Sequence, residues 1–165
     1  MNVDNYGYRR NTVMGGILCG VFLALGSLLQ QMGIVYTTAG KAGFITAMYM
    51  LIVPVISFLF LCKKNHWLTW LSVLIGMNGM YLLCVQESFS LNRGDVLVAV
   101  CALFFSLHIL SCDHFAPQSD PIGLAAIQFA TVAVISLIAA MLTEQPTMAK
   151  LTSAALPILY CGIVS

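Results

Sequence analysis

Long apolar stretches alternate with short hydrophilic breaks along the 165-residue chain. The apolar stretches cover residues 14–36, 42–62, 67–85, 96–112 and 122–142, and a sixth runs from near residue 151 to 165. A helix needs roughly 17–25 apolar residues to cross the hydrocarbon core of a bilayer, because each residue adds about 1.5 Å. The first five stretches therefore predict membrane-spanning helices, whereas the sixth is too short.

The breaks between these stretches are short, so successive helices are predicted to lie antiparallel. They read KKNH, QESFSLNRGD, DHFAPQSDP and TEQPTMAK. Asp120 followed by Pro121 is typical of a helix start, with Asp120 as the capping residue. Pro54 and Pro157 lie inside apolar stretches, where a proline is expected to kink a membrane helix without ending it.

The composition indicates lipid rather than water as the solvent. Hydrophobic residues make up 60% of the chain and charged residues 8%, whereas soluble domains carry roughly 25% charged residues. The mean hydropathy of +0.94 points the same way. The formal net charge of +1 argues against nucleic acid as a partner. The predicted fold class is an all-α, polytopic membrane helix bundle whose main partner is the lipid bilayer.

Six cysteines are scattered through the chain without a Cys-x-x-Cys pair or a Cys/His cluster in the sequence. Free cysteine behaves as a small hydrophobe, so we interpret these residues as packing residues and expect neither a disulfide framework nor a zinc site. The sequence also lacks HExxH and GxSxG motifs, and paired acids inside the apolar stretches are missing. We therefore expect no enzyme, no catalytic residues, no cofactor and no bound metal.

Basic residues in the short breaks set the expected orientation, because they favour the cytoplasmic side of a membrane. One side carries Arg9, Arg10, Lys63 and Lys64, and the other carries Lys41, Arg93 and Lys150. The basic pairs at both ends of the first helical hairpin predict a cytoplasmic N-terminus. The bend at residues 37–41 then faces outward.

A weak internal echo links the first and sixth apolar stretches. LCGV at 18–21 resembles YCGI at 160–163, and the two segments are expected to enter the membrane from opposite sides. Related segments in opposite orientation are typical of inverted repeats. If this is a repeat, a complete protein would have ten helices in about 300 residues, and this chain would be incomplete.

Several stretches resemble EamA-type transporters of the drug/metabolite transporter superfamily. GGILCGVFLALGSLLQQMGIVYTTAGKAGFITAMYMLIVPVIS resembles the third and fourth helices of that family, and GDVLVAVCALFFSLHILSCDHFA resembles the sixth. DPIGLAAIQF resembles the start of the seventh, and LPILYCGIVS the start of the eighth. The resemblance implies a ten-helix fold of two inverted five-helix repeats. Residues 1–92 would be the end of the first repeat, and residues 93–165 the start of the second, with its last helix truncated.

The same resemblance implies a function. It predicts a multi-pass carrier of the bacterial inner membrane that moves small metabolites or drugs, commonly outward, by alternating access between its repeats. A second membrane chain or a homodimer is a further candidate partner. The alternative is a truncated membrane scaffold or assembly partner that does not transport.

Polar side chains inside membrane spans are costly unless paired, and they tend to mark transport pathways. The candidate pathway residues are Gln30, Gln31, Thr46, Tyr49, Ser106 and His108. Gln30 and Gln31 point about 100° apart on a helix, so we do not expect both to face one cavity. Each also fits a hydrogen bond to a neighbouring helix. The sequence leaves open whether these glutamines and the Thr46–Tyr49 face meet a solute or one another.

The other candidates also have two interpretations each. Thr46 fits the pathway or a bond to its own helix, and Tyr49 fits a solute or cation contact or an interfacial anchor. Ser106 is a candidate for the same pathway. His108 fits a proton relay, or a neutral histidine bonded to a backbone carbonyl.

Two packing features complete the sequence prediction. Gly16 and Gly20, four residues apart, predict a close approach between helices. Asn78, between two glycines in GMNGMY, predicts a hydrogen bond to another helix in a tight contact. The acidic residues, including Asp95 and Asp113, are placed at helix ends or in loops, so no carboxylate is expected inside a complete span.

Overall fold

The computed structural model describes residues 3–60, 66–84, 92–143, 155 and 159–160. Within these ranges every secondary-structure element is helical, which confirms the all-α class for this part of the chain. The elements are α1 (Val3–Ile34), α2 (Ala39–Ala47), α3 (Tyr49–Phe60), α4 (Trp67–Cys84), α5 (Arg93–Phe115), the short 3₁₀ helix η1 (Ala116–Gln118) and α6 (Pro121–Thr143). Most of the sixth apolar stretch, with Pro157 and most of the YCGI segment, lies outside the described residues.

Four helical segments among the described residues are long and apolar enough to cross a membrane. They are Gly7–Ile34, Ala39–Leu59, Arg93–Gln118 and Pro121–Thr143. These segments support a multi-pass membrane protein. The 18 residues of α4 stand at the lower limit for a span, and this helix is not among the four. The span expected at residues 67–85 therefore stays a prediction.

Two compact units make up the chain, Met1–Val132 and Ala133–Ser165. The first contains α1 to α5, η1 and the beginning of α6; the second contains the end of α6. Every contact and site discussed below lies within the first unit. The division into compact units does not test the repeat boundary that the sequence predicts between residues 92 and 93. That boundary stays a prediction.

Small residues form the interior of the first unit, while large apolar side chains cover much of its exterior. The buried apolar positions include Cys19, Ala24 and Ala102. By contrast, the side chains of Ile75 and Leu82 on α4 are 66% and 70% exposed. Such an exterior suits hydrocarbon, where exposed leucine and isoleucine carry no penalty, and small interior residues let helix backbones approach closely.

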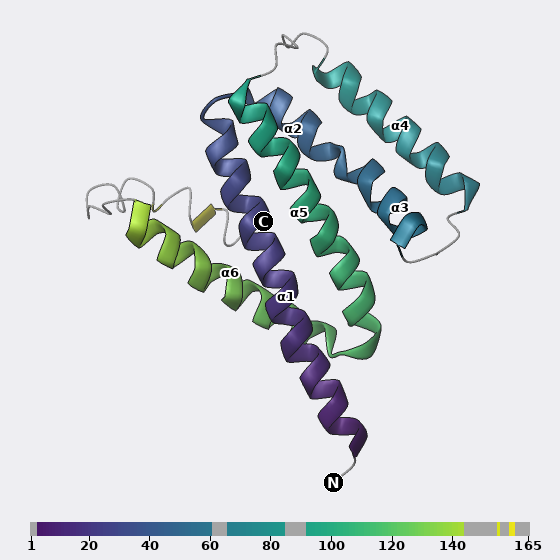
Figure 1. Ribbon diagram of the computed structural model, residues 1–165, viewed down its shortest axis with the longest axis vertical. Coiled ribbons are helices and arrows are strands. Elements are labelled where there is room, and N and C mark those ends of the chain that lie inside the picture. Colours follow the sequence, from purple (N-terminus) through teal and green to yellow (C-terminus); the bar gives the residue numbers. More distant parts are fainter. Residues whose placement is uncertain (1–2, 61–65, 85–91, 144–154, 156–158, 161–165) are drawn as a thin grey trace. The chain divides into compact units, whose positions relative to one another are not determined.

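The most extensive helix pair is formed by α1 and α5, which run side by side in Figure 1. Gly33 of α1 and Gly94 of α5 bring the two backbones together where α1 ends and α5 begins. A Cβ atom on Gly94 would lie 2.6 Å from the Gly33 carbonyl oxygen, closer than real contacts allow. α2 and α3 also pack on α5, and α4 packs mainly on α2. α5 is therefore the central helix of this unit.

The close approach predicted for Gly16 and Gly20 is confirmed. A Cβ atom on Gly16 would lie 2.7 Å from Ile127 Cβ, and one on Gly20 would lie 2.6 Å from Thr131 Cβ. These partners belong to the first half of α6. The two glycines thus leave α6 room to pack directly on the backbone of α1.

The prediction for Asn78 is wrong. Its Nδ2 donates a 2.8 Å hydrogen bond to the Leu74 carbonyl of its own helix, and its side chain is exposed. A Cβ atom on the neighbouring Gly79 would meet nothing within 4 Å. An asparagine amide reaches the carbonyl four residues earlier without help from a second helix, and here this local bond prevails.

The apolar stretch at residues 42–62 forms two helices rather than one. Met48 separates α2 from α3; its N–H donates to the Ile45 carbonyl, and its own carbonyl accepts from the N–H of Leu51 and Ile52. Pro54 lies inside α3, which continues through it as expected for a membrane helix. The helix break therefore occurs before the proline, not at it.

The predicted start of α6 is confirmed. The helix begins at Pro121, and the Asp120 carboxylate accepts hydrogen bonds from the N–H groups of Ile122 and Gly123 at 3.3 and 2.9 Å. Thr12 of α1 adds a hydroxyl oxygen that accepts from the Asp120 N–H at 3.1 Å. This cap therefore also ties the connection before α6 to the first helix.

Candidate functional site

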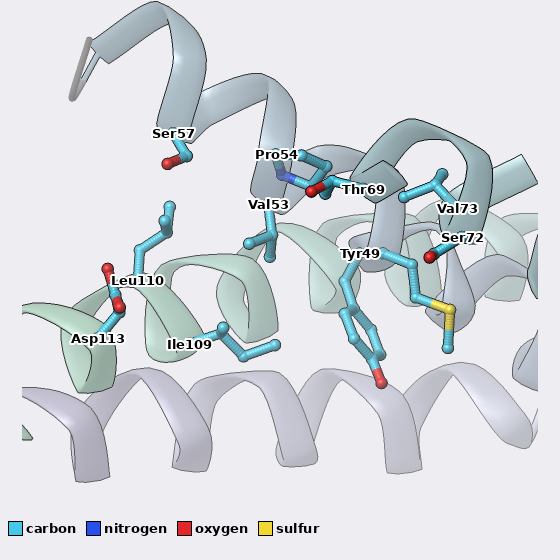
Figure 2. A pocket seen from close by; sticks show the side chains of 11 residues that line it. Tyr49, Val53, Pro54, Ser57, Thr69, Ser72, Val73, Ile109, Leu110 and Asp113 are labelled. Carbon is cyan, nitrogen blue, oxygen red and sulfur yellow. The ribbon is translucent and has the colours of Figure 1, made fainter. Parts of the chain in front are cut away.

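A pocket of about 600 Å³ lies between α3, α4 and α5 (Figure 2). Its lining consists of Tyr49, Met50, Val53, Pro54 and Ser57 from α3, Thr69, Ser72 and Val73 from α4, and Ile109, Leu110 and Asp113 from α5. Apolar side chains make most of the wall, and hydroxyl groups and one carboxylate interrupt it. This combination is typical of sites for small organic ligands.

The polar groups of the pocket are spread along its length. Figure 2 shows Ser57 and Asp113 toward one end and Tyr49 and Ser72 toward the other. Ser57 and Asp113 lie close to the C-terminal ends of α3 and α5, whereas Tyr49 is the first residue of α3. The pocket therefore runs along most of α3 from the helix end that the sequence predicts to be cytoplasmic.

Among the six candidate pathway residues, Tyr49 lines this pocket. Gln30 and Thr46 instead bond to each other, with Gln30 Nε2 donating to Thr46 Oγ1 at 3.1 Å. The side chain of Gln31 is exposed. The side chains of Gln30 and Gln31 therefore point in different directions, as their helical spacing predicts. The Gln30 hydrogen bond joins α1 to α2. A role of these residues in transport stays a prediction.

Ser106 and His108 also lie outside the pocket lining. Ser106 is fully buried, and its hydroxyl donates to the Ala102 carbonyl at 2.7 Å. His108 Nδ1 lies 3.0 Å from the Cys19 carbonyl oxygen. This is the backbone carbonyl contact that the sequence offered as the alternative to a proton relay, and it joins α5 to α1.

Sequence reasoning missed a buried ion pair. Lys41 Nζ lies 2.6 Å from Asp95 Oδ2, with the two side chains 8% and 2% exposed. Asp95 lies at a helix end, as expected, because it is the third residue of α5. The bend expected at residues 37–41 is shorter than predicted, because α2 begins at Ala39 and includes Lys41. The sequence did contain one signal for this pair, because Lys41 and Asp95 both fall at the helix ends predicted to face outward.

Hydrogen bonds complete the surroundings of the Asp95 carboxylate. The Thr37 hydroxyl donates to Oδ1 at 2.7 Å, and the Asn92 N–H donates to Oδ2 at 2.7 Å. A buried charge pair is tolerated when its remaining lone pairs are also satisfied. The ion pair therefore fastens α2 to α5 at the end of the bundle opposite Asp113.

A second missed feature is a group of sulfur and nitrogen ligand atoms. Cys19 of α1 and His108 and Cys112 of α5 bring one such atom each to within 4.8 Å of one another. His108 and Cys112 are one helical turn apart, which the sequence shows, but Cys19 joins them from a distant part of the chain. The absence of a Cys/His cluster in the linear sequence therefore did not exclude one in space.

Comparison with known proteins supports the membrane assignment. Residues 6–85 match the EamA-like transporter family. An uncharacterized transporter of Archaeoglobus fulgidus is 36% identical over 121 residues, which is 73% of this chain and 39% of that protein. The chain thus spans 39% of the length of the curated relative it matches. No solved structure matches the chain. Residues 6–85 therefore carry an EamA-like transporter family domain, set in a multi-pass membrane helix bundle.

Proposed function

We propose that the protein acts as a membrane carrier that exports small amphipathic organic solutes by alternating access. The observation that carries this proposal is the pocket between α3, α4 and α5, which is lined from helices that the sequence places in the membrane. The EamA-like transporter match at residues 6–85 supports it.

The pocket lining suits a solute with an apolar body and a polar group. Its volume of about 600 Å³ falls in the range of small-molecule sites, about 300–1,000 Å³. Val53, Pro54 and Leu110 offer apolar contact, while the hydroxyl of Tyr49 both donates and accepts hydrogen bonds. Asp113 places a carboxylate near one end of the pocket, where it favours solutes that carry an amine or a hydroxyl group.

The proposed transport cycle uses the contrast between the two ends of the bundle. The pocket reaches the end marked by Ser57 and Asp113, whereas the Lys41–Asp95 pair joins the helices at the other end. This pair links residues 1–92 to residues 93–165, the two proposed repeats of a ten-helix inverted-repeat carrier in the bacterial inner membrane. Separating Lys41 from Asp95 would open the outward end, while the proposed cytoplasmic entrance closes.

A transport assay on the full-length protein tests this proposal. Inside-out membrane vesicles are incubated with a panel of amphipathic amines, alcohols and neutral analogues in the medium, and uptake is compared with vesicles lacking the protein. We expect Tyr49→Ala and Ser57→Leu to reduce uptake of the transported solute to background. Leu74→Ala, on the exposed face of α4, serves as the matched control and is expected to keep full uptake. Equal transport by the pocket variants and the wild type, at equal membrane levels, would show that the pathway lies elsewhere.

A further inference from the structure

Two cysteines and a histidine converge where α1 packs against α5. Cys19 Sγ lies 3.5 Å from Cys112 Sγ, and His108 Nε2 lies 3.8 Å from Cys112 Sγ. All three ligand atoms lie within 4.8 Å of one another. We propose that Cys19, His108 and Cys112 bind a thiophilic divalent cation in tetrahedral geometry. Zn²⁺ is the cation that this ligand set fits best. This site is separate from the pocket and does not depend on the proposed transport function.

Two of the three separations, both made by Cys112 Sγ, come close to those of a tetrahedral centre. With metal–sulfur bonds of about 2.3 Å, two sulfur ligands of a tetrahedral Zn²⁺ lie about 3.8 Å apart. A sulfur and a nitrogen ligand lie about 3.5 Å apart on the same geometry. The separations of 3.5 Å between the two sulfurs and 3.8 Å between Cys112 Sγ and His108 Nε2 differ from these values by a few tenths of an ångström. Cys19 and His108, the third pair, bring their ligand atoms to within 4.8 Å. Two sulfurs on opposite sides of a linearly coordinated ion would lie about 4.6 Å apart, which fits less well.

His108 is already oriented as metal-binding histidines are. Its Nδ1 contacts the Cys19 carbonyl oxygen at 3.0 Å. In the tautomer that donates Nδ1–H to this carbonyl, Nε2 keeps its lone pair for a metal. Ligating histidines generally donate their second ring N–H in this way, which fixes both the tautomer and the ring orientation. The carbonyl contact therefore supports metal binding rather than competing with it.

Charge balance favours a divalent ion at this position. Binding releases one proton from each thiol to solvent, and forms two metal–sulfur bonds and one metal–nitrogen bond without electron transfer. Two thiolates and one divalent cation sum to zero charge, so the complex avoids the large cost of a net charge in an apolar interior. His108 and Cys112 are half-buried, so neither side chain is sealed inside the bundle.

A fourth ligand position is available beside Cys112. The amide oxygen Oε1 of Gln128 lies 3.7 Å from Cys112 Sγ, and this side chain is buried. Gln128 comes from α6, so an ion held here would join three helices. Bound metal would therefore resist separation of α1 from α5 and α6.

Metal titration of the purified full-length protein tests the site. The protein is prepared with reductant, stripped of metal and titrated with Co²⁺, then with Zn²⁺. We expect an intense visible spectrum of tetrahedral Co²⁺ and a thiolate-to-cobalt charge-transfer band, both lost on addition of Zn²⁺. Cys112→Ser and His108→Gln are expected to weaken binding by about tenfold or more. Cys101→Ser is the matched control, because Cys101 is a buried cysteine of α5 outside the cluster, and it is expected to bind as the wild type does.

Three results would overturn the proposal. The first is that the wild-type protein shows no spectrum of tetrahedral Co²⁺. The second is that Cys112→Ser binds the metal with the same affinity as the wild type. The third is that a Cys19–Cys112 disulfide persists in the reduced preparation. A measurement on the wild type keeps the test valid if the variants fail to fold. Zn²⁺ is expected to slow alkylation of the half-buried Cys112 by a maleimide, read by mass spectrometry, and not that of the cysteines outside the cluster. Absence of this protection also overturns the proposal.

Discussion

Lys41 Nζ of α2 lies 2.6 Å from Asp95 Oδ2 of α5, in an ion pair whose side chains are almost fully withdrawn from the surface. The Thr37 hydroxyl and the Asn92 N–H donate to the same carboxylate. Each charge makes the burial of the other tolerable. The pair therefore fixes how the first turn of α2 lies on the first turn of α5, close to the tight contact between Gly33 and Gly94.

Breaking this ion pair from one side is expected to destabilise the protein strongly. Asp95→Leu leaves the Lys41 ammonium buried without this counter-charge, which costs about 3–5 kcal/mol in comparable sites. The double variant Lys41→Met/Asp95→Leu removes both charges and is expected to recover most of that loss. The free energy of unfolding in detergent micelles, measured for wild type, both single variants and the double variant, checks this. Strictly additive losses would mean that the two side chains do not interact.

The hydrogen bond between Gln30 and Thr46 predicts a small, measurable coupling. Bonds of this kind between membrane helices average about 0.6 kcal/mol and reach about 1.7 kcal/mol. A double-mutant cycle with Gln30→Ala and Thr46→Val is expected to give a coupling in that range. The matched control pairs Gln31→Ala with Thr46→Val and is expected to give none, since Gln31 is exposed. Equal coupling in both cycles would contradict the 3.1 Å contact.

A methyl group at Gly94 is expected to force α1 and α5 apart. The added Cβ would lie 2.6 Å from the backbone carbonyl of Gly33, which has no flexible side chain to move aside. Overpacking of this kind costs about 1–3 kcal/mol. Gly79→Ala is the control, because its Cβ would meet nothing within 4 Å, and better helix propensity is expected to stabilise it by up to about 1 kcal/mol. Thermal unfolding of both variants distinguishes a contact effect from a general glycine effect.

The carboxylate of Asp113 is expected to influence which solutes the proposed carrier accepts. Asp113→Asn removes a negative charge from the pocket lining, so uptake of an amine-bearing solute is expected to fall relative to its uncharged analogue. Competition between the two analogues in the same vesicles measures this ratio and corrects for differences in protein amount. An unchanged ratio would show that Asp113 does not contact the transported group.

The local features that the sequence predicted were largely found in the structure. The cap formed by Asp120 and the helix start at Pro121 depend on adjacent residues, and the structure confirms both. The small pair Gly16 and Gly20 also packs closely on another helix, as expected. The prediction failed at Asn78, whose amide bonds within its own helix. An exposed amide has a local partner always within reach, and sequence spacing does not reveal which partner it takes.

The candidate site was predicted in part. Tyr49 lines the pocket, but most of its neighbours there, such as Val53 and Leu110, are ordinary apolar residues in the sequence. A pocket arises from the spacing between helices, so residues without distinctive chemistry form most of its wall. For Gln30 and Thr46, the sequence left open whether the two side chains face a solute or each other. The structure joins them by a hydrogen bond.

The sequence by itself determined the apolar helices, most of their limits and the assignment to a membrane, because length, hydropathy and capping are properties of neighbouring residues. The tertiary structure alone decided that Lys41 meets Asp95 and that Cys19 meets His108 and Cys112. Each of these contacts depends on how far a helix is rotated about its own axis. Helices that are apolar on all sides carry little amphipathic pattern to specify that rotation. Close packing of small residues such as Gly33 and Gly94 provides the missing constraint, and it exists only once the helices are assembled.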